Sequence, residues 1–237
     1  MNFAIIAAGE GSRLVQEGVA VPKPLVDLDG RPMIRRLIDI FRSCDAESIS
    51  VIVNEQMTQV RDYLETVRAE IDTPMQLVVK STPSSMHSFY EVSSVFPAGS
   101  KFILTTVDTI FRPDDFRRYA AAFAADNTCD GYMAVTEFID DEKPLYIDTD
   151  ADGIITAFCD EPFPGVRYIS GGIYGLTTPA VGILSECMAN GVSRMRNYQR
   201  ALVSAGLRLR AYNLGKIIDV DHPSDIATAR AFIADGK

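Results

Sequence analysis

The sequence predicts an α/β fold in which helices cover a sheet of parallel strands. Apolar runs of strand length alternate along the chain with segments of helical periodicity, and this alternation is typical of parallel strands joined by covering helices. The chain has 237 residues, 47% of them hydrophobic and 23% charged, so it can bury a core of ordinary composition. No internal repeat, low-complexity segment or linker divides it, which favours one domain over residues 1–237.

The predicted strands begin near the N-terminus and recur almost to the end of the chain. They are residues 3–7, 49–53, 75–79, 102–106, 132–136, 154–158, 169–176 and 207–212. Apolar residues spaced three or four apart predict helices over residues 34–41, 57–67 and 226–233, the last of them starting near Ser224. The polar stretch 140–152 is predicted to be a hairpin or loop and not a domain boundary.

Charge and cysteine content exclude several classes of partner and site. A net charge of −9 and a pI of about 4.8 argue against binding to nucleic acid or to an anionic membrane. Four cysteines without a C-x-x-C motif predict neither a zinc site nor a disulfide framework. The N-terminus lacks the features of a signal peptide, and no apolar stretch approaches the roughly 20 residues of a membrane span, so we expect a cytoplasmic protein. Nothing in the sequence marks an oligomeric state.

A glycine-rich turn directly follows the first predicted strand. The turn comprises Ala7, Ala8, Gly9, Gly11 and Ser12. Its backbone N–H groups can point at one small volume, and glycine lets a phosphate approach without a Cβ in the way. Arg13 and Lys23 add cations suited to phosphate oxygens. Alone, the motif is also compatible with an ordinary turn; a dinucleotide fold is disfavoured because Leu14 stands where its third glycine belongs.

Three aspartates follow apolar segments, where an α/β sheet places its ligands. Asp108 comes directly after an apolar strand, and Asp219 and Asp221 follow a late apolar pair at residues 217–218. Nucleotidyl transfer needs a divalent ion, which one or two carboxylates usually hold. Taken alone, such an aspartate is more often a solvated turn carboxylate than a metal ligand.

Together the motifs resemble the sugar-1-phosphate nucleotidyltransferases, the NDP-sugar pyrophosphorylase family. The similarity rests on Ala-Ala-Gly-x-Gly-x-Arg-Leu at residues 7–14, Pro-Lys-Pro-Leu at 22–25 and Gly-Arg-Pro-Met-Ile at 30–34. It implies that family's three-layer α/β/α fold around a mostly parallel mixed sheet, which is Rossmann-like and GT-A-like. Residues 1–110 would then form the nucleotide-binding half, and residues 111–237 the acceptor-binding half.

The resemblance also implies Mg²⁺ as cofactor, held by Asp108 and Asp219. Residues 105–108 stand where the family has Leu-x-Gly-Asp, and residues 219–226 resemble its later Asp-x-Gly-Thr-Pro-Glu-Asp-Leu. Asp221 is an accessory candidate at a position where the family often has glycine. Arg13 and Lys23 would be the catalytic cations, with Arg13 and the turn on the β- and γ-phosphates and Lys23 on the α-phosphate.

The segments that face the acceptor match the family only in part. Glu161 and Gly172 fit its Glu-Lys-Pro and Asn-x-Gly-x-Tyr segments, but the lysine and the asparagine are missing. A basic run over residues 194–216 offers replacement cations, although such a run is usually a solvated helix face. The candidates for acceptor binding within this run are Arg194, Arg196 and Lys216.

The loop that reads the base in this family corresponds to residues 80–89. Ser84 and Ser85 could hydrogen-bond the nucleotide or cap the helix that follows. The loop is somewhat closer to the phosphocholine cytidylyltransferase branch, which favours CTP over other nucleotides.

The sequence therefore predicts Mg²⁺-dependent transfer of a nucleotide from a nucleoside triphosphate to a phosphorylated small molecule, with release of pyrophosphate. One alternative is a GT-A-type glycosyltransferase, whose usual Asp-x-Asp metal site would have to lie mid-chain; the mid-chain Asp-x-Asp strings, at residues 148–152, fall in the polar stretch. Another alternative is a nucleotide-sensing module without turnover, because the acceptor segments depart from the family pattern.

Overall fold

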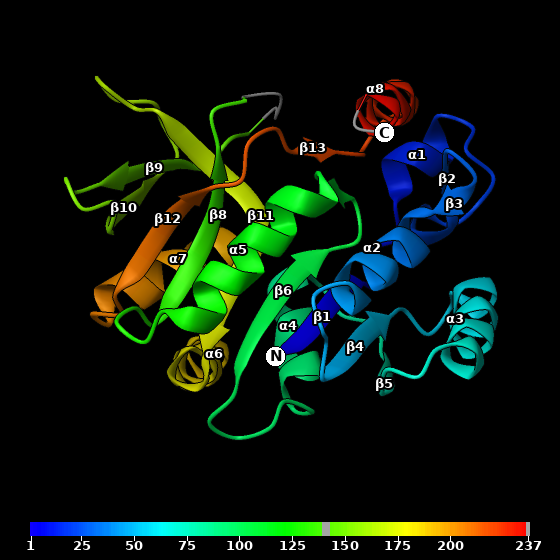
Figure 1. Cartoon of the computed structure of the whole chain (residues 1–237), viewed down its shortest axis with the longest axis horizontal. Helices are drawn as coiled ribbons and strands as arrows, with labels where there is room; N and C mark the ends of the chain where they lie inside the picture. The colour runs from blue at the N-terminus through cyan, green and yellow to red at the C-terminus, as the bar shows by residue number, and fades with distance from the viewer. Residues whose placement is uncertain (139–142, 236–237) are drawn as a thin grey trace.

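The computed structural model describes residues 1–138 and 143–235, and within them a nine-stranded sheet forms the centre of the molecule (Figure 1). The main path through the sheet is β10 (Ile155–Cys159), β9 (Tyr146–Thr149), β11 (Tyr168–Thr177), β6 (Lys101–Thr106), β1 (Asn2–Ala7), β4 (Ser48–Val53) and β5 (Met75–Val79). Two more strands continue from β11, namely β8 (Gly131–Thr136) and, beside it, β12 (Leu209–Asn213).

The sheet is mixed and mostly parallel, as predicted. Strand β1 pairs in parallel with β4 and β6, β4 with β5, and β8 with β12. Strand β11 runs against β6, β8 and β9, and β10 runs against β9. The parallel strands therefore direct their carboxyl ends, and the loops that follow them, toward one edge of the sheet.

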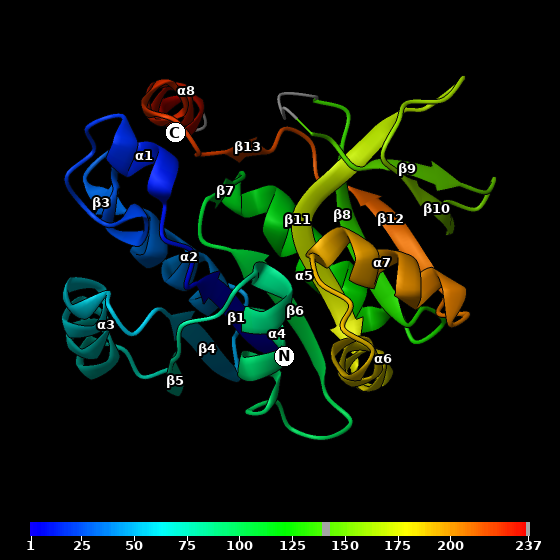
Figure 2. The ribbon, with the colours of Figure 1, turned by 180° about the vertical axis from the view of Figure 1, so that it is seen from behind.

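Helices cover both faces of the sheet, so the molecule has three layers (Figures 1 and 2). The helices of one face are α2 (Met33–Arg42), α3 (Thr58–Glu70) and α5 (Pro113–Ala125), and those of the other are α4 (Ser85–Ser93), α6 (Thr178–Ala189) and α7 (Met195–Ser204). Strand β1 shows why both faces are covered: Phe3 and Ile5 join the first apolar core, whereas Ala4 and Ile6 join the second. Alternate residues of a strand point to opposite faces, so a strand buried on both sides is apolar throughout.

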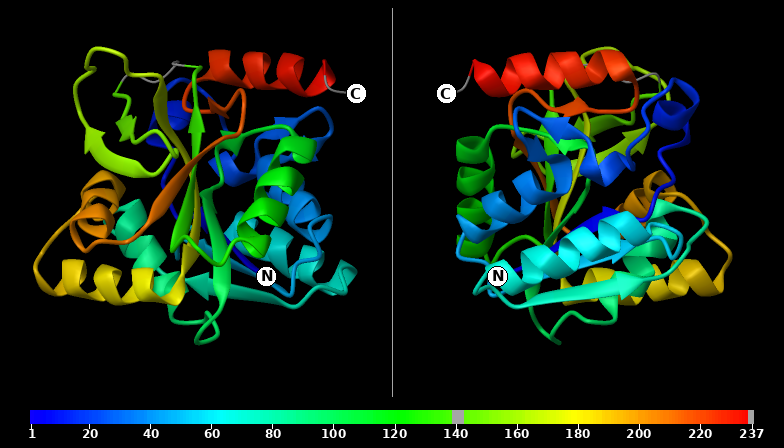
Figure 3. Two further views of the ribbon diagram at one scale, coloured as in Figure 1. Left: turned by 60° about the vertical axis from the view of Figure 1, so that its left-hand side comes forward. Right: turned by 90° about the vertical axis from the view of Figure 1, so that its right-hand side faces the viewer.

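Short elements gather at the carboxyl edge of the sheet. They are α1 (Ser12–Gln16), a 3₁₀ turn (Lys23–Leu25), the β2–β3 ribbon (Asp27–Leu28 and Arg31–Pro32), β7 (Thr109–Ile110), β13 (Ile218–Asp219) and α8 (Pro223–Ala234). Strand β13 pairs antiparallel with β7, which brings the late part of the chain beside Asp108. Helix α8 lies across the end of the sheet toward which β8 points (Figure 3).

The strands predicted from the sequence are confirmed, with small differences at their ends. The strand predicted to start at residue 207 starts at Leu209, and the last helix begins at Pro223, beside Ser224 as predicted, with His222 as its N-cap. Within the polar stretch 140–152, residues 146–149 form β9, which makes an antiparallel hairpin with β10; residues 139–142 lie outside the described residues. None of the described helices is both long and apolar enough to cross a membrane.

Candidate active site

The glycine turn follows β1 and folds tightly onto Lys23. Gly11 has φ 62°, and a Cβ added to it would lie 2.9 Å from Cβ of Lys23. Only glycine satisfies both the left-handed backbone and this close approach at low cost. Gly9 differs, because a Cβ added there would meet nothing within 4 Å. The turn therefore needs glycine at position 11 for folding and leaves open space at position 9.

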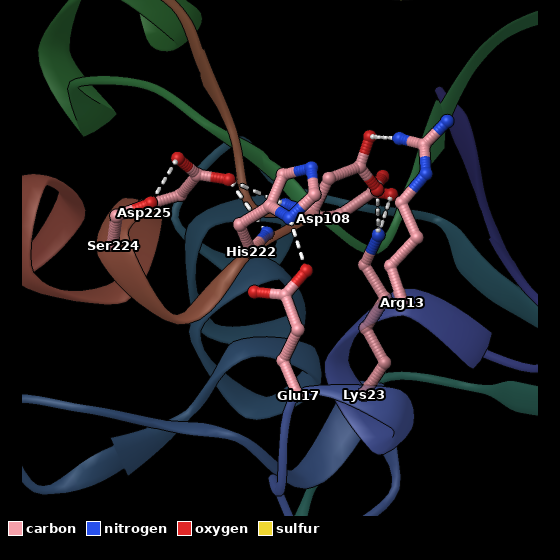
Figure 4. Close-up of polar contacts among 8 residues, drawn as sticks. Arg13, Glu17, Lys23, Asp108, His222, Ser224 and Asp225 are labelled. Carbon is pink, nitrogen blue, oxygen red and sulfur yellow. Dashed lines mark hydrogen bonds and ion pairs between the residues drawn. The ribbon is translucent and has the colours of Figure 1, made fainter.

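Lys23 is the centre of a network of charges. Its side chain is buried, and Nζ donates to Oδ2 of Asp108 at 2.5 Å and to Oδ1 of Asp221 at 2.8 Å. Nη1 of Arg13 donates to the other oxygen of Asp221 at 2.8 Å, and Figure 4 shows Arg13 and Lys23 pointing the same way. Two cations from the first 25 residues thus meet two carboxylates from distant parts of the chain.

Burial and neighbouring charges shift the pKa values of Lys23 and Asp221 in opposite directions. Burial alone lowers the pKa of Lys23, but the carboxylates of Asp108 and Asp221 outweigh it and raise the pKa overall. Burial tends to raise the pKa of Asp221, yet Lys23, and then Arg13, bring it below its usual value. Lys23 and Asp221 are therefore both charged at neutral pH.

The loop that carries Asp221 is fixed from two sides. Oδ2 of Asp225 accepts hydrogen bonds from the backbone N–H groups of Asp221 at 2.9 Å and of His222 at 2.7 Å, an acidic cap at the start of α8. Nδ1 of His222 lies 2.6 Å from Oε1 of Glu17, at the end of α1 (Figure 4). These contacts connect the late aspartates to the helix that follows the glycine turn.

Two neighbouring cavities open at this edge. The first, of about 330 Å³, is lined by Gly9, Gly11, Ser12, Arg13, Lys23, Val107, Asp108 and Asp221. The second, of about 230 Å³, is lined by Lys143, Leu145, Ser170, Gly172, Tyr174, Arg194, Met195, Arg196, Gln199 and Asp219. The β7–β13 ribbon connects them, since Asp219 pairs with Thr109, the residue after Asp108.

An irregularity in β11 shapes the second cavity. The register of β11 against β8 shifts between Ser170 and Tyr174, and Gly172 within this bulge has φ 71°. Burial is the main reason why the pKa of Tyr174 is raised, and the carboxylates of Asp219 and Asp108 raise it further. The carboxylates of Asp108 and Asp219 therefore both act electrostatically on the Tyr174 hydroxyl, although they line different cavities.

The structure brings some of the predicted site residues together and leaves others apart. Those that line the two cavities are Gly9, Gly11, Ser12, Arg13, Lys23, Asp108, Gly172, Arg194, Arg196 and Asp219. Ala7 and Ala8 are buried at the end of β1. Glu161 is exposed and lines neither cavity. Lys216 does not line them either, because its ammonium group lies over the ring of Phe138, 4.2 Å from the ring centre.

Ser84 and Ser85 lie outside both cavities. Ser84 is the N-cap of α4, and its Oγ accepts a long hydrogen bond of 3.4 Å from the backbone N–H of His87. Ser85 is the first residue of that helix. The capping role is thus observed for Ser84, and a role in binding the nucleotide stays a prediction for both serines.

The chain is similar in sequence and in fold to known proteins. Residues 3–158 match the model of the MobA-like NTP transferase domain. The chain belongs to this family. The predicted resemblance to sugar-phosphate nucleotidyltransferases is confirmed with it, and the chain is an enzyme of the nucleotidyltransferase type.

Individual relatives of this NTP transferase agree with the family match. It is 22% identical to the bifunctional protein GlmU of Streptomyces avermitilis over 98% of its length and 50% of that protein's. It is 32% identical to the 2-aminoethylphosphonate cytidylyltransferase of Lancefieldella rimae over 43% of its length and 41% of that protein's. The chain thus spans half or less of the length of these curated relatives. The inositol-1-phosphate CTP transferase from T. maritima shares the fold, with a TM-score of 0.81 and 19% identity over 99% of this chain and 96% of that one.

Sequence reasoning missed several cavity residues of this NTP transferase. Gln199 is buried in α7, where its Nε2 donates to the Tyr174 hydroxyl at 3.2 Å. It stands on the apolar face of that helix with Met195, Tyr198 and Leu202, and a glutamine within an apolar stripe is a signal that could have found it. Lys143 gave no such signal, because it lies in a polar stretch like many surface lysines.

The two glycines of the turn provide a matched pair of substitutions. Gly11→Ala is expected to lower the free energy of unfolding by about 1–2 kcal/mol, since a Cβ is unfavourable in the left-handed region and this one also meets Lys23. Gly9→Ala is expected to fold normally but to raise the KM for the nucleotide, because its methyl group enters the first cavity. Denaturant melts and initial-rate kinetics test both; an equal loss of stability in the two variants would contradict this account.

Proposed function

We propose that this NTP transferase joins a nucleoside triphosphate to a small phosphate or phosphonate acceptor and releases pyrophosphate. The observation that carries the proposal is the pair of cation-lined cavities on either side of the β7–β13 ribbon, which contains Asp219 and directly follows Asp108. One cavity suits the triphosphate of the donor, and the other suits the anionic group of the acceptor. Residues 1–110 would supply most of the donor site and residues 111–237 the acceptor site.

Cationic side chains and backbone N–H groups would bind the triphosphate of the donor. Arg13 and the N–H groups around Gly9 and Gly11 would bind the β- and γ-phosphates, which leave as pyrophosphate. Lys23 would contact the α-phosphate and stabilise the negative charge that develops there. The acceptor oxygen attacks the α-phosphorus in line, and because that oxygen is already ionised, no general base is needed.

The carboxylates suit a hard divalent cation such as Mg²⁺, and enzymes of this family generally use one. Asp108 and Asp221 already surround one cation, the ammonium of Lys23, and Asp219 lies in the adjoining cavity. Mg²⁺ at phosphate-binding sites is usually held by one or two carboxylates together with phosphate oxygens. We assign the ion to Asp108 and Asp219; when bound, it neutralises phosphate charge.

CTP is the proposed donor. The loop over residues 80–89 resembles the cytidylyltransferase branch, and the relatives include a 2-aminoethylphosphonate cytidylyltransferase. The cation count of the second cavity supports an acceptor with a phosphate or phosphonate group, since Lys143, Arg194 and Arg196 all line it. Arg196 also contacts Asp160 at 2.5 Å and the carbonyl of Lys143 at 2.9 Å, so Arg194 is the better candidate for direct contact.

Pyrophosphate release tests the function. The purified protein is incubated with Mg²⁺ and each of the four common nucleoside triphosphates, and with inositol 1-phosphate, glucose 1-phosphate, phosphocholine or 2-aminoethylphosphonate. We expect release that requires both substrates and is greatest with CTP. Release without an acceptor, or none with any pair, would contradict the proposed reaction, and a preference for another nucleotide would contradict the choice of CTP alone.

The conformation of Arg194 provides a prediction for the acceptor side. Arg194 has φ 74°, and such strained residues concentrate at functional sites. Arg194→Gly is expected to leave stability unchanged or slightly higher, because glycine tolerates this φ. It should nevertheless raise the acceptor KM by about ten-fold or more, the equivalent of roughly 1.4 kcal/mol for one lost charged contact.

The control for this variant is Lys216→Ala. Lys216 belongs to the same basic run, but it contacts Phe138 and Phe232 and does not line the second cavity. Its acceptor KM should stay within about two-fold of wild type. If Lys216→Ala raises the acceptor KM and Arg194→Gly does not, the acceptor cation has been assigned to the wrong residue.

A further inference from the structure

A third cavity lies away from the two described above, and its lining residues come from α2, the start of α5 and the C-terminal half of α8. Its volume is about 340 Å³, and it is lined by Arg36, Phe111, Arg112, Pro113, Asp114, Phe232 and Ile233. None of these residues lines either cavity of the candidate active site. The cavity thus combines two arginines with an apolar wall and one carboxylate, Asp114, which is itself paired with Arg117.

Arg36 is a half-buried cation without a compensating carboxylate among the described residues. Its Nη2 donates to the backbone carbonyl of Phe111, while Nη1 is shielded from solvent and has no hydrogen-bond partner. Burial lowers the pKa of Arg36 to about 10. Burying a charge without a partner is costly, so proteins seldom retain such a group unless something neutralises it.

Arg112 is the second uncompensated cation of this cavity. It is half-buried, and its guanidinium lies 4.6 Å from the ring centre of Phe232. The structure gives it no carboxylate partner in the part of the chain that it describes. The arginines that follow on α5 differ, since Arg117 contacts Asp114 and Arg118 contacts Asp115. In a chain with net charge −9, two neighbouring arginines without such partners are unusual.

We propose that this cavity binds a small organic phosphate. The phosphate group would lie between the guanidinium groups of Arg36 and Arg112, whose planar donors suit phosphate oxygens and would neutralise the ligand's charge. The apolar part of the ligand would pack against Phe232 and Ile233, which form the wall contributed by α8. A free phosphate satisfies only the first requirement, so the ligand class is a phosphate monoester with an apolar or aromatic group.

The position of this site connects it to the candidate active site. Phe111 and Arg112 directly follow β7, which begins after Asp108, and Phe232 belongs to the helix that begins two residues after Asp221. A ligand in this cavity would contact α2, α5 and α8 at the same time and would stabilise their packing. The ligand would therefore contact the two chain segments that follow Asp108 and Asp219, and it would not enter the first cavity.

The test uses phenyl phosphate as the probe and the δ-methyl NMR signal of Ile233 as the readout, because Ile233 lines this cavity and neither of the others. The signal is assigned with Ile233→Val. We expect a saturable shift, and a Kd that rises by about ten-fold or more in Arg36→Met and in Arg112→Met, as for one lost charged contact each. Inorganic phosphate should bind more weakly, and neutral benzyl alcohol should give no saturable shift.

Arg118→Met is the matched control, since it removes an arginine from the same part of α5 but outside the cavity. Its Kd should stay within about two-fold of wild type. In addition, Arg36→Met without ligand should melt at or above the wild-type temperature, because methionine removes the uncompensated charge. No saturable shift of Ile233, or binding that survives both cavity substitutions, would overturn the proposal. The readout does not depend on turnover, so an inactive enzyme would leave the result interpretable.

Discussion

Replacing Lys23 by alanine is expected to lower kcat by about 10²–10³-fold, the usual effect of removing one preorganised charge from a transition state. Lys23 is buried and stiffened by Pro22 and Pro24 on either side, so its ammonium group occupies one place between Asp108 and Asp221. A lysine held in this way needs little reorganisation when negative charge develops on the α-phosphate. The KM for the nucleotide should change less than kcat, because the contact strengthens mainly in the transition state.

The same substitution should also reduce stability. Without the ammonium group, two carboxylates remain near one another with no cation between them, at an expected cost of about 1–3 kcal/mol. The raised pKa of Lys23 stabilises the fold below the pKa of an unfolded lysine, and this contribution is lost only as pH rises through the folded value. The lowered pKa of Asp221 stabilises the fold above the unfolded value and is lost as pH falls through the folded one. The stability difference between wild type and Lys23→Ala should therefore be constant between about pH 6 and 9.

Single-turnover kinetics and urea melts measure the two effects separately. The control is Arg68→Ala, which removes a cation paired with Glu65 on the exposed face of α3. Such surface pairs contribute about 0–1 kcal/mol, so this variant should match wild type in both rate and stability. A Lys23→Ala enzyme that retains most of its rate of pyrophosphate release would refute the catalytic role. A lost rate with unchanged stability would refute only the electrostatic account of the network.

Local signals in the sequence were sufficient to predict the fold and the glycine turn that lines the first cavity. Strand β1 is apolar throughout because both faces are covered, and the glycines follow it directly, so its identity depends on neighbouring residues alone. The same holds for the strand before Asp108. For such segments, pattern and turn chemistry agree with the tertiary structure.

Contacts between distant segments could not be predicted in the same way. The ion pair between Arg13 and Asp221 joins residues 208 positions apart, and it depends on the antiparallel pairing of two very short strands. Nor does composition distinguish Arg194 from Lys216, although the first lines a cavity and the second stacks on aromatic rings. Only tertiary structure determines which cations of a basic run line the second cavity.

The roles of Asp219 and Asp221 follow from the same geometry. Asp221 binds both cations that the triphosphate would need, whereas Asp219 lines the second cavity, the proposed acceptor site, and pairs with Thr109, the residue after Asp108. A carboxylate already engaged by Lys23 and Arg13 must release at least one of them when phosphates bind. Asp221 would then compete with the nucleotide for these cations, while Asp219 would hold the ion on the side of the acceptor.

This division of roles predicts different kinetics for two conservative variants. Asp219→Asn should lower kcat by about 10²–10³-fold, like Asp108→Asn, because either change removes a charged ligand of the ion, and it should raise the Mg²⁺ concentration needed for half-maximal rate. Asp221→Asn should change kcat by less than about ten-fold and leave the KM for the nucleotide equal or lower, since the competing charge is gone. Magnesium titrations of pyrophosphate release for all three variants show whether Asp219 or Asp221 holds the ion together with Asp108. If Asp221→Asn instead behaves like Asp108→Asn while Asp219→Asn stays active, the ion belongs between Asp108 and Asp221, where Lys23 now lies.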